Sequence, residues 1–114
     1  MTLGEAQRLF ARRIPRLIDY INDNGYECTF GDAYRSPKAH GGMGEKGPYG
    51  RPRSAHKNRL AIDLNLFLDG EYLTDGEAHR PFAEYWVSLD PENHVSGIDF
   101  NDANHYSYRW NGIA

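Results

Sequence analysis

Four residues of this sequence have the types and spacing that metal-assisted hydrolysis requires. His56 precedes Asp63 by seven positions, and Asp102 precedes His105 by three. Two imidazoles and one carboxylate form a common catalytic zinc set, because three protein ligands leave the fourth coordination position for a water molecule, whose pKa the metal lowers to about 7. His56, Asp63 and His105 are therefore candidate zinc ligands.

Asp102 is the candidate general base of such a site. A carboxylate beside the water can take its proton and later give it to the leaving amine. The spacing from His56 to Asp63 is not a local helical motif, because it requires a loop to approach a strand. Three unrelated polar residues would have the same spacing, and the spacing alone favours that simpler interpretation.

The first element that must position these residues is a strand predicted over residues 60–68. Because side chains alternate across a strand, Asp63 shares one face with Ala61 and Asn65, which predicts a polar cavity there. The opposite face is aliphatic and consists of Ile62, Leu64, Leu66 and Leu68. Asp63 is thus expected in the middle of a strand and not at a turn.

The remaining pattern predicts an α+β fold, with a small, mainly antiparallel sheet and two or more helices packed on it. Apolar residues at helical spacing predict a helix over residues 4–24, which Pro15 should kink or divide. A strand is expected over residues 26–35, a second helix from Pro81 to about residue 89, and a last strand around residues 105–110.

The composition is that of one ordinary domain covering residues 1–114. Hydrophobic residues make up 39% of the chain and aromatic residues 13%, which is enough for a core. A net charge of −3 argues against broad nucleic-acid binding, which needs a cationic surface. No apolar run is long enough to span a membrane, and the first residues carry charges where an export signal needs an apolar stretch. We expect a soluble monomer without a signal peptide.

Residues 36–55 are rich in glycine and proline and carry several basic side chains. Such a segment continues neither a helix nor a strand, so we predict a mobile, cationic loop beside the site. The alternative is a flexible insertion without a function.

The other ionisable side chains are interpreted as surface or packing residues. His40, His79 and His94 have no partner at ligand spacing and are expected at the surface, with His94 in a polar loop. Cys28 is the single cysteine, so no intramolecular disulfide forms, and we interpret it as a small buried residue. A Cys28 thiol nucleophile working with His105 is the alternative, although no electropositive surrounding is evident.

Several separate segments are similar to the M15 family of zinc peptidases. The similarity spans residues 26–108, and the segments agree with the family in order and spacing. They are Asp32-Ala33-Tyr34-Arg35-Ser36, Ser54-x-His56-x6-Asp63 with Leu60-Ala61-Ile62-Asp63-Leu64-Asn65, residues 67–73, residues 82–86 and Asp102-x-x-His105. More narrowly, the chain resembles the L-alanyl-D-glutamate endopeptidase endolysins of bacteriophages, which are related to D-Ala-D-Ala carboxypeptidases and dipeptidases.

The resemblance implies a hedgehog/D-Ala-D-Ala peptidase-like fold with a zinc site at the sheet. It implies that His56, Asp63 and His105 bind the zinc ion and that Asp102 is the catalytic carboxylate. Arg35 matches an arginine that the family uses near the scissile group, where a guanidinium binds a substrate carboxylate or stabilises the developing oxyanion. An ordinary surface ion pair is the alternative for this residue.

The resemblance also implies a substrate and a place of action. The expected reaction is cleavage of peptidoglycan stem peptides at the L-Ala/D-Glu bond. The enzyme would be an endolysin, made in the cytoplasm of the bacterial host and released through the inner membrane to the cell wall. Ser54 is expected to hydrogen-bond within the site and to contact substrate; a serine without a role is the alternative. The basic residues Lys38, Lys46, Arg51 and Arg53 are candidate contacts for the anionic stems.

One departure from the family concerns the substrate groove. Many relatives carry a Trp-Gly-Gly-Asp-like run shortly before Asp-x-x-His, whereas this chain has Val95-Ser96-Gly97-Ile98-Asp99-Phe100. The missing tryptophan leaves the metal ligands untouched and bears on the shape of the groove. The alternatives are a D-Ala-D-Ala carboxypeptidase or dipeptidase with the same site, a non-catalytic cell-wall-binding protein, in which Asp102 would serve no purpose, and a structural protein.

Overall fold

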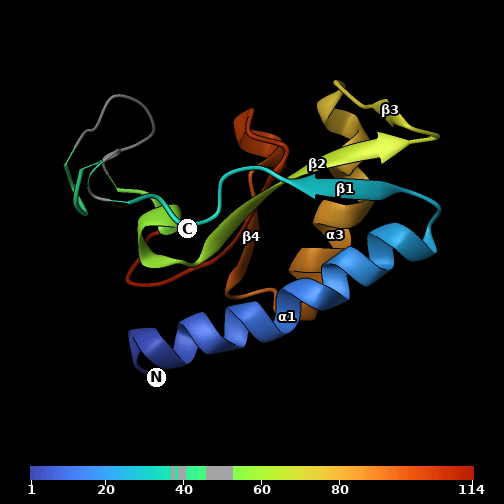
Figure 1. Ribbon diagram of the computed structural model, residues 1–114. Helices are drawn as coiled ribbons and strands as arrows, with labels where there is room; N and C mark the ends of the chain where they lie inside the picture. Colours follow the sequence, from blue (N-terminus) through green and yellow to red (C-terminus); the bar gives the residue numbers. More distant parts are fainter. Residues whose placement is uncertain (37, 39–40, 46–52) are drawn as a thin grey trace.

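The computed structural model describes residues 1–36, 38, 41–45 and 53–114, and these form an α+β fold (Figure 1). The predicted fold class is confirmed at this level: two helices accompany a small antiparallel sheet. The helices are α1 (Leu3–Asp23) and α3 (Arg80–Leu89), and the strands are β1 (Glu27–Phe30), β2 (Ala61–Leu68), β3 (Glu71–Tyr72), β4 (His94–Ser96) and β5 (His105–Tyr108). Short 3-10 turns cover Ala55–Asn58, Gly76–His79 and Ile98–Phe100.

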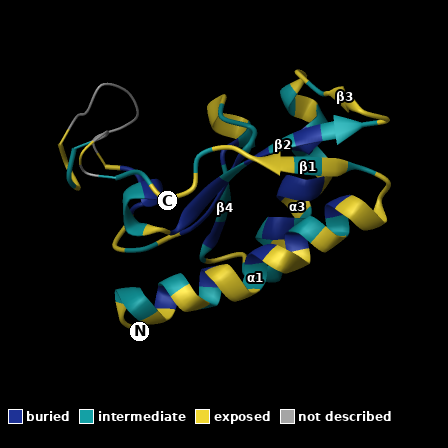
Figure 2. Ribbon diagram, in the orientation of Figure 1, coloured by how far each residue is buried: buried dark blue, intermediate teal, exposed yellow. Residues whose placement is uncertain are grey.

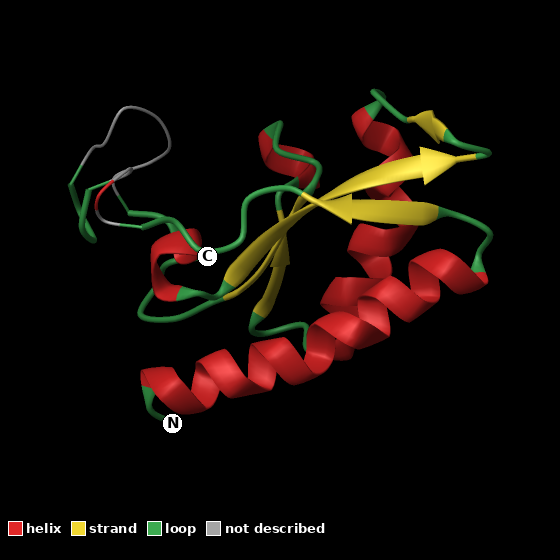
Figure 3. Ribbon diagram, in the orientation of Figure 1, coloured by secondary structure: helices red, strands yellow, loops and turns green. Residues whose placement is uncertain are grey.

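The sheet has the strand order β1-β2-β5-β4, with β3 pairing on β2, and all of its pairs are antiparallel. Strand β2 is the long central strand, and α1 runs beneath the sheet while α3 lies behind it (Figure 3). In β2 the residues Ile62, Leu64 and Leu66 are buried while Asp63 and Asn65 are only half-buried. The predicted alternation is therefore confirmed from Ile62 to Leu66, where Asp63 lies on the face away from the core, whereas Ala61 is buried and Leu68 only half-buried.

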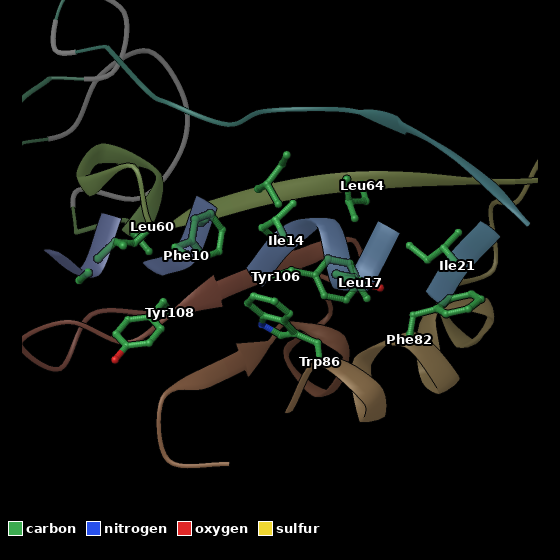
Figure 4. Packing of buried hydrophobic residues seen from close by; sticks show 14 of the residues in the cluster. Phe10, Ile14, Leu17, Ile21, Leu60, Leu64, Phe82, Trp86, Tyr106 and Tyr108 are labelled. Atoms are coloured by element: carbon green, nitrogen blue, oxygen red, sulfur yellow. The ribbon is translucent and has the colours of Figure 1, made fainter. Parts of the chain in front are cut away.

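The core fills the space between the helices and one face of the sheet (Figure 4). Helix α1 contributes a buried row at helical spacing, which consists of Ala6, Phe10, Ile14, Leu17 and Ile21. Trp86 of α3 is fully buried and donates its indole N–H to the carbonyl of Ser107 at 3.0 Å. Both helices carry buried and exposed positions (Figure 2), so each turns one face toward the core and another toward solvent.

Pro15 was expected to kink or divide the first helix, but α1 continues through it as one helix. The proline lacks the N–H that would bond to the carbonyl of Ala11, four residues earlier. Both residues are exposed, so water can hydrogen-bond to that carbonyl. Ile14 and Leu17, on either side, are buried, and this packing keeps the helix continuous through the proline.

The strand expected over residues 26–35 is shorter than predicted and ends at Phe30. Beyond it the chain keeps contact with β2 through single bonds: the N–H of Gly31 bonds to the carbonyl of Asp63, and the N–H of Asp63 bonds to the carbonyl of Asp32, each at 2.8 Å. A Cβ on residue 31 would lie 3.1 Å from the Cβ of Asp63. Glycine therefore lets this segment pass closely over the candidate ligand.

Two histidines that were expected at the surface are buried, so that prediction is wrong for both. His94 belongs to β4, which was expected to be a loop, and its ring stacks on Trp86 with centroids 3.7 Å apart. Its Nδ1 bonds to the carbonyl of Trp86 at 2.8 Å, and the Nδ1 of His79 pairs with the Tyr106 hydroxyl at 2.8 Å. A paired imidazole packs in a core at little cost, and nothing in the local sequence reveals the partner. His40 lies outside the described residues.

Acid is expected to destabilise the protein through His79. Burial lowers the pKa of His79 to about 4, whereas an unfolded histidine titrates near 6.5. Between these values the unfolded chain holds a proton that the folded chain does not. The free energy of unfolding therefore falls as the pH drops from about 6.5 to about 4, by about 3 kcal/mol in total.

Urea denaturation at several pH values measures this effect, and His79→Asn is the matched variant. The asparagine amide can occupy the position of Nδ1 toward Tyr106 but does not titrate. The variant should lose this part of the pH dependence. An equal slope in the two proteins would contradict the assignment to His79.

The predicted loop over residues 36–55 is described only in part. Residues 37, 39–40 and 46–52, with the basic side chains of Lys46 and Arg51, lie outside the described residues. Within the described segment, the Lys57 ammonium donates to the carbonyl of Gly42 at 3.0 Å. Among the described residues, no helix has both the length and the hydrophobicity needed to cross a membrane.

Candidate metal centre

His56, Asp63 and His105 converge from three segments of the chain onto one point. His56 lies in the 3-10 turn Ala55–Asn58, which begins at Ser54, and the Ser54 hydroxyl accepts the backbone N–H of His56 at 3.2 Å. Asp63 and His105 are directly opposed in the antiparallel pairing of β2 with β5. One ligand atom from each of the three residues lies within 4.8 Å of the others, so this group could hold a metal ion.

The spacing of these atoms suits a small tetrahedral ion. The Oδ1 of Asp63 lies 3.1 Å from the Nε2 of His56 and 3.7 Å from the Nδ1 of His105. Ligand atoms bound tetrahedrally at about 2.0–2.1 Å, as around zinc, lie about 3.3 Å apart. These two separations bracket this value, and the three side chains thus meet at one point, as a metal site requires.

The orientation of His56 provides an independent test of the fit. Its Nδ1 lies 2.7 Å from the carbonyl of Ala33, and because a carbonyl only accepts, Nδ1 carries the proton. In the neutral ring, Nε2 then presents its lone pair to Asp63. The Nε2 of His56 and the Oδ1 of Asp63 are both buried and have no hydrogen-bond partner among the described residues. A proton between these two atoms would join them as an ion pair, and a metal cation between them would satisfy both as well. The bond to Ala33 is typical support for a metal-bound imidazole.

The charge of Asp63 fits the same role. Burial raises the pKa of Asp63, but hydrogen bonds and positive charge from the imidazoles of His105 and His56 outweigh burial and hold the pKa of this carboxyl well below its usual range. Asp63 is therefore an ionised, half-buried carboxylate at neutral pH. Such a group needs a positive charge beside it.

Asp102 lies at the open side of the cluster. Its Oδ2 is 3.8 Å from the Nδ1 of His105, and its side chain is 39% exposed, so water reaches it. The backbone N–H of Asp102 donates to the carbonyl of Gly97 at 3.0 Å, and the N–H of His105 donates to the carbonyl of Asp102 at 3.1 Å. These bonds hold the candidate base and a candidate ligand in one tight loop.

Gly97 is where that loop closes, and Gly97→Ala is expected to disturb the site. A Cβ on this residue would collide with the backbone of Asp102. We expect a loss of stability of about 1–3 kcal/mol and a displaced Asp102, measured by thermal unfolding and by activity. Gly4→Ala is the control, since its Cβ would meet only the end of the Arg8 side chain, at 3.4 Å. Equal stability of the Gly97→Ala variant and the parent would contradict this role.

Arg35 and Ser54 lie together beside the cluster. The Nη1 of Arg35 donates to the hydroxyl of Ser54 at 3.3 Å, and its Nε donates to Asp32 at 3.2 Å. The ion pair that was the alternative for Arg35 is thus present, but it uses one of five N–H donors. Ser54 is buried and links Arg35 to the turn that carries His56.

These residues line one pocket of about 290 Å³, which we call the arginine pocket. Its walls include Arg35, Arg53, Ser54, His56, Asp102 and His105. With the exception of Asp63, which does not line it, the expected residues of the site are therefore brought together around one cavity. Phe100 and Asn101 also line it and were not expected there. Phe100 is 73% exposed, and its only sequence signal was its position in the run that departs from the family.

Cys28 does not belong to this cavity. It pairs with Leu66 in the β1–β2 register and packs against the core. Burial raises the pKa of its thiol, which disfavours the thiolate that nucleophilic attack needs.

Comparisons with known proteins assign no family. No family model, curated protein or solved structure matches this chain. The chemistry of the site is therefore argued from its own residues.

Zinc is expected to stabilise the protein through this centre. An ion that binds only the folded chain raises the free energy of unfolding by about 2.7 kcal/mol when its concentration is 100 times the Kd. Thermal unfolding with added zinc, and again after EDTA, measures the shift. Magnesium is the control ion, because it favours oxygen ligands over imidazole. An unchanged melting temperature with zinc would contradict the metal centre.

Proposed function

We propose that this protein is a zinc metallopeptidase that hydrolyses the stem peptides of bacterial peptidoglycan at the L-Ala/D-Glu bond. It would act as a bacteriophage endolysin of the M15 type, with the corresponding hedgehog/D-Ala-D-Ala peptidase-like fold. The single observation that carries the proposal is that the buried Nε2 of His56 and the buried Oδ1 of Asp63 face each other at 3.1 Å with no other hydrogen-bond partner among the described residues, beside a pocket that His56 and Asp102 line.

His56, Asp63 and His105 would hold the zinc ion. When bound, zinc lowers the pKa of a water molecule and polarises a carbonyl. Asp102 accepts the proton from the attacking water at a carboxylate oxygen and returns it to the leaving amine. Its exposed position, 3.8 Å from the Nδ1 of His105, supports this role, because water and substrate can reach the carboxylate beside the ligand cluster.

Arg35 and Arg53 would bind the acidic part of the substrate. A guanidinium binds a carboxylate through two parallel N–H bonds. The bonds from Arg35 to Asp32 and Ser54 orient its guanidinium and leave other N–H groups for a ligand. Ser54 thereby positions both Arg35 and His56, which is a larger role than contact with substrate alone.

The test is mass spectrometry of fragments released from purified peptidoglycan, with and without a chelator. New fragments with D-Glu at the amino terminus, abolished by chelation, are the expected result. Loss of terminal D-Ala would instead assign a carboxypeptidase or dipeptidase that uses the same site. No cleavage by the zinc-loaded protein would contradict the enzyme and favour cell-wall binding without catalysis.

A further inference from the structure

A second hollow adjoins the arginine pocket, and Asp102 lies on the wall between them. This hollow has a volume of about 240 Å³. We call it the amide pocket, because Asn65 and Asn104 line it together with Tyr72 and Asp75. Asn101 and Asp102 line both pockets. A ligand that lies across Asp102 would therefore place one end in each pocket.

The two pockets differ in charge. The arginine pocket is lined by Arg35 and Arg53, whereas no lysine or arginine of the described chain lines the amide pocket. The carboxylates that line the amide pocket are Asp75 and the shared Asp102. An anionic group is therefore attracted to one pocket and repelled by the other.

The asparagines of the amide pocket adjoin two candidate ligands in sequence. Asn65 follows Asp63 by two positions on β2, so it lies on the same face about 7 Å along the strand. Asn104 immediately precedes His105 at the start of β5. The two side chains therefore extend the cluster along the open face of the sheet.

Their side-chain amides are held only weakly. The Nδ2 of Asn104 lies 3.5 Å from the Oδ1 of Asn65, and the Nδ2 of Asn65 lies 3.5 Å from the hydroxyl of Thr29. Bonds of this length are at the limit for a hydrogen bond and cost little to exchange. Each amide offers both donors and an acceptor, as a peptide group does. These side chains are therefore suited to bind an amide of a ligand.

We infer that the amide pocket binds an uncharged N-acyl-alanyl group on the amino side of the cleaved bond, while the arginine pocket binds the carboxylate-bearing side. This inference rests on the proposed function. In a peptidoglycan stem the alanyl nitrogen is acylated by the lactoyl group of muramic acid, and carboxylates occur from D-Glu onward. The uncharged end of the stem therefore matches the amide pocket, and its anionic end matches the arginine pocket. Asp102 lies between the two pockets, where the leaving amine needs its proton.

The test compares two ligands that differ only on the amino side. One is a stem peptide that begins with N-acetyl-L-Ala-D-Glu, and the other begins with propionyl-D-Glu, which lacks the N-acyl amide and adds no charge. Both are titrated calorimetrically into zinc-loaded Asp102→Asn protein, which should bind them without turnover. The acetylated peptide is expected to bind about tenfold more tightly, as one or two additional hydrogen bonds predict.

The variants Asn65→Leu and Asn104→Leu, made in that background, should remove the difference and leave the affinity for the propionyl peptide unchanged. Arg53→Gln should weaken both ligands equally. Asn22→Leu in α1, which lines neither pocket, is the matched control and should change neither affinity.

Equal affinity of the two ligands for the Asp102→Asn protein, or equal loss of both in the asparagine variants, would overturn the inference. If that protein binds neither ligand, the inference is overturned as well. Fragment release by the unmodified protein distinguishes failure of this inference from failure of the proposed function. Cleavage with no discrimination contradicts only the amide pocket, whereas absence of cleavage contradicts the proposed function itself.

Discussion

Asp102→Asn is expected to retain zinc and to lose turnover by about 100- to 10,000-fold. The amide has nearly the same shape as the carboxylate, but it cannot accept the proton of the attacking water. Because Asp102 lies outside the three-residue ligand cluster, the metal content should stay at that of the parent. Fragment release gives the rate, and elemental analysis gives the zinc content.

Asp99→Asn is the control for this substitution. Asp99 lies in the same loop, its side chain is 71% exposed, and it pairs with Arg80 at 3.1 Å. Its replacement removes a negative charge near the site without removing a group from either pocket. We expect its rate to stay close to that of the parent. If Asp102→Asn also kept the parental rate, Asp102 would not be the base.

Replacing His56 is expected to remove both zinc and activity. The other two ligand side chains remain, but two protein ligands hold zinc far less tightly than three. His56→Ala also truncates a fully buried ring and leaves the carbonyl of Ala33 without its donor. Such a change lowers the free energy of unfolding by about 2–5 kcal/mol. Loss of activity in this variant alone could therefore reflect either loss of the metal or loss of the fold.

His56→Asn separates the two effects. The asparagine Nδ2 can occupy the position of Nδ1 and donate to Ala33, but the shorter side chain has no atom at the position of Nε2. We expect a folded protein with no bound zinc and no activity. Far-UV circular dichroism checks the fold, and dialysis against zinc followed by elemental analysis checks the metal. A folded variant with one zinc ion per chain would show that His56 is not a ligand.

The resemblance predicted which three side chains would meet, and the strand pattern predicted where one of them would lie. Asp63 is a carboxylate within the alternating stretch of residues 62–66, and this alternation determines the face on which it lies. The strand β4 has no such signal, because its three residues pair with β5 through backbone bonds that any residue can make. His94 accordingly looked like a loop residue, although it stacks on Trp86.

The supporting contacts of the site could not be predicted from local patterns. The carbonyl of Ala33 orients His56, and Gly97 gives room to Asp102. The first contact joins residues 23 positions apart, and the second forms where the chain between Gly97 and Asp102 turns back on itself. Neither depends on a side chain with recognisable chemistry. The residue types of the cluster predict a metal site, whereas the orientation of the side chains depends on contacts made by the backbone.

The direct pairing of Asp63 with His105 makes strand register and metal binding a single property of this molecule. Successive side chains of a strand point to opposite faces, so a slip of one residue between β2 and β5 would turn Asp63 toward the helices or place Tyr106 opposite it. A chain that binds zinc tightly has therefore aligned its central strands correctly. Metal uptake during refolding would thus report, in real time, the moment at which these two strands reach their native alignment.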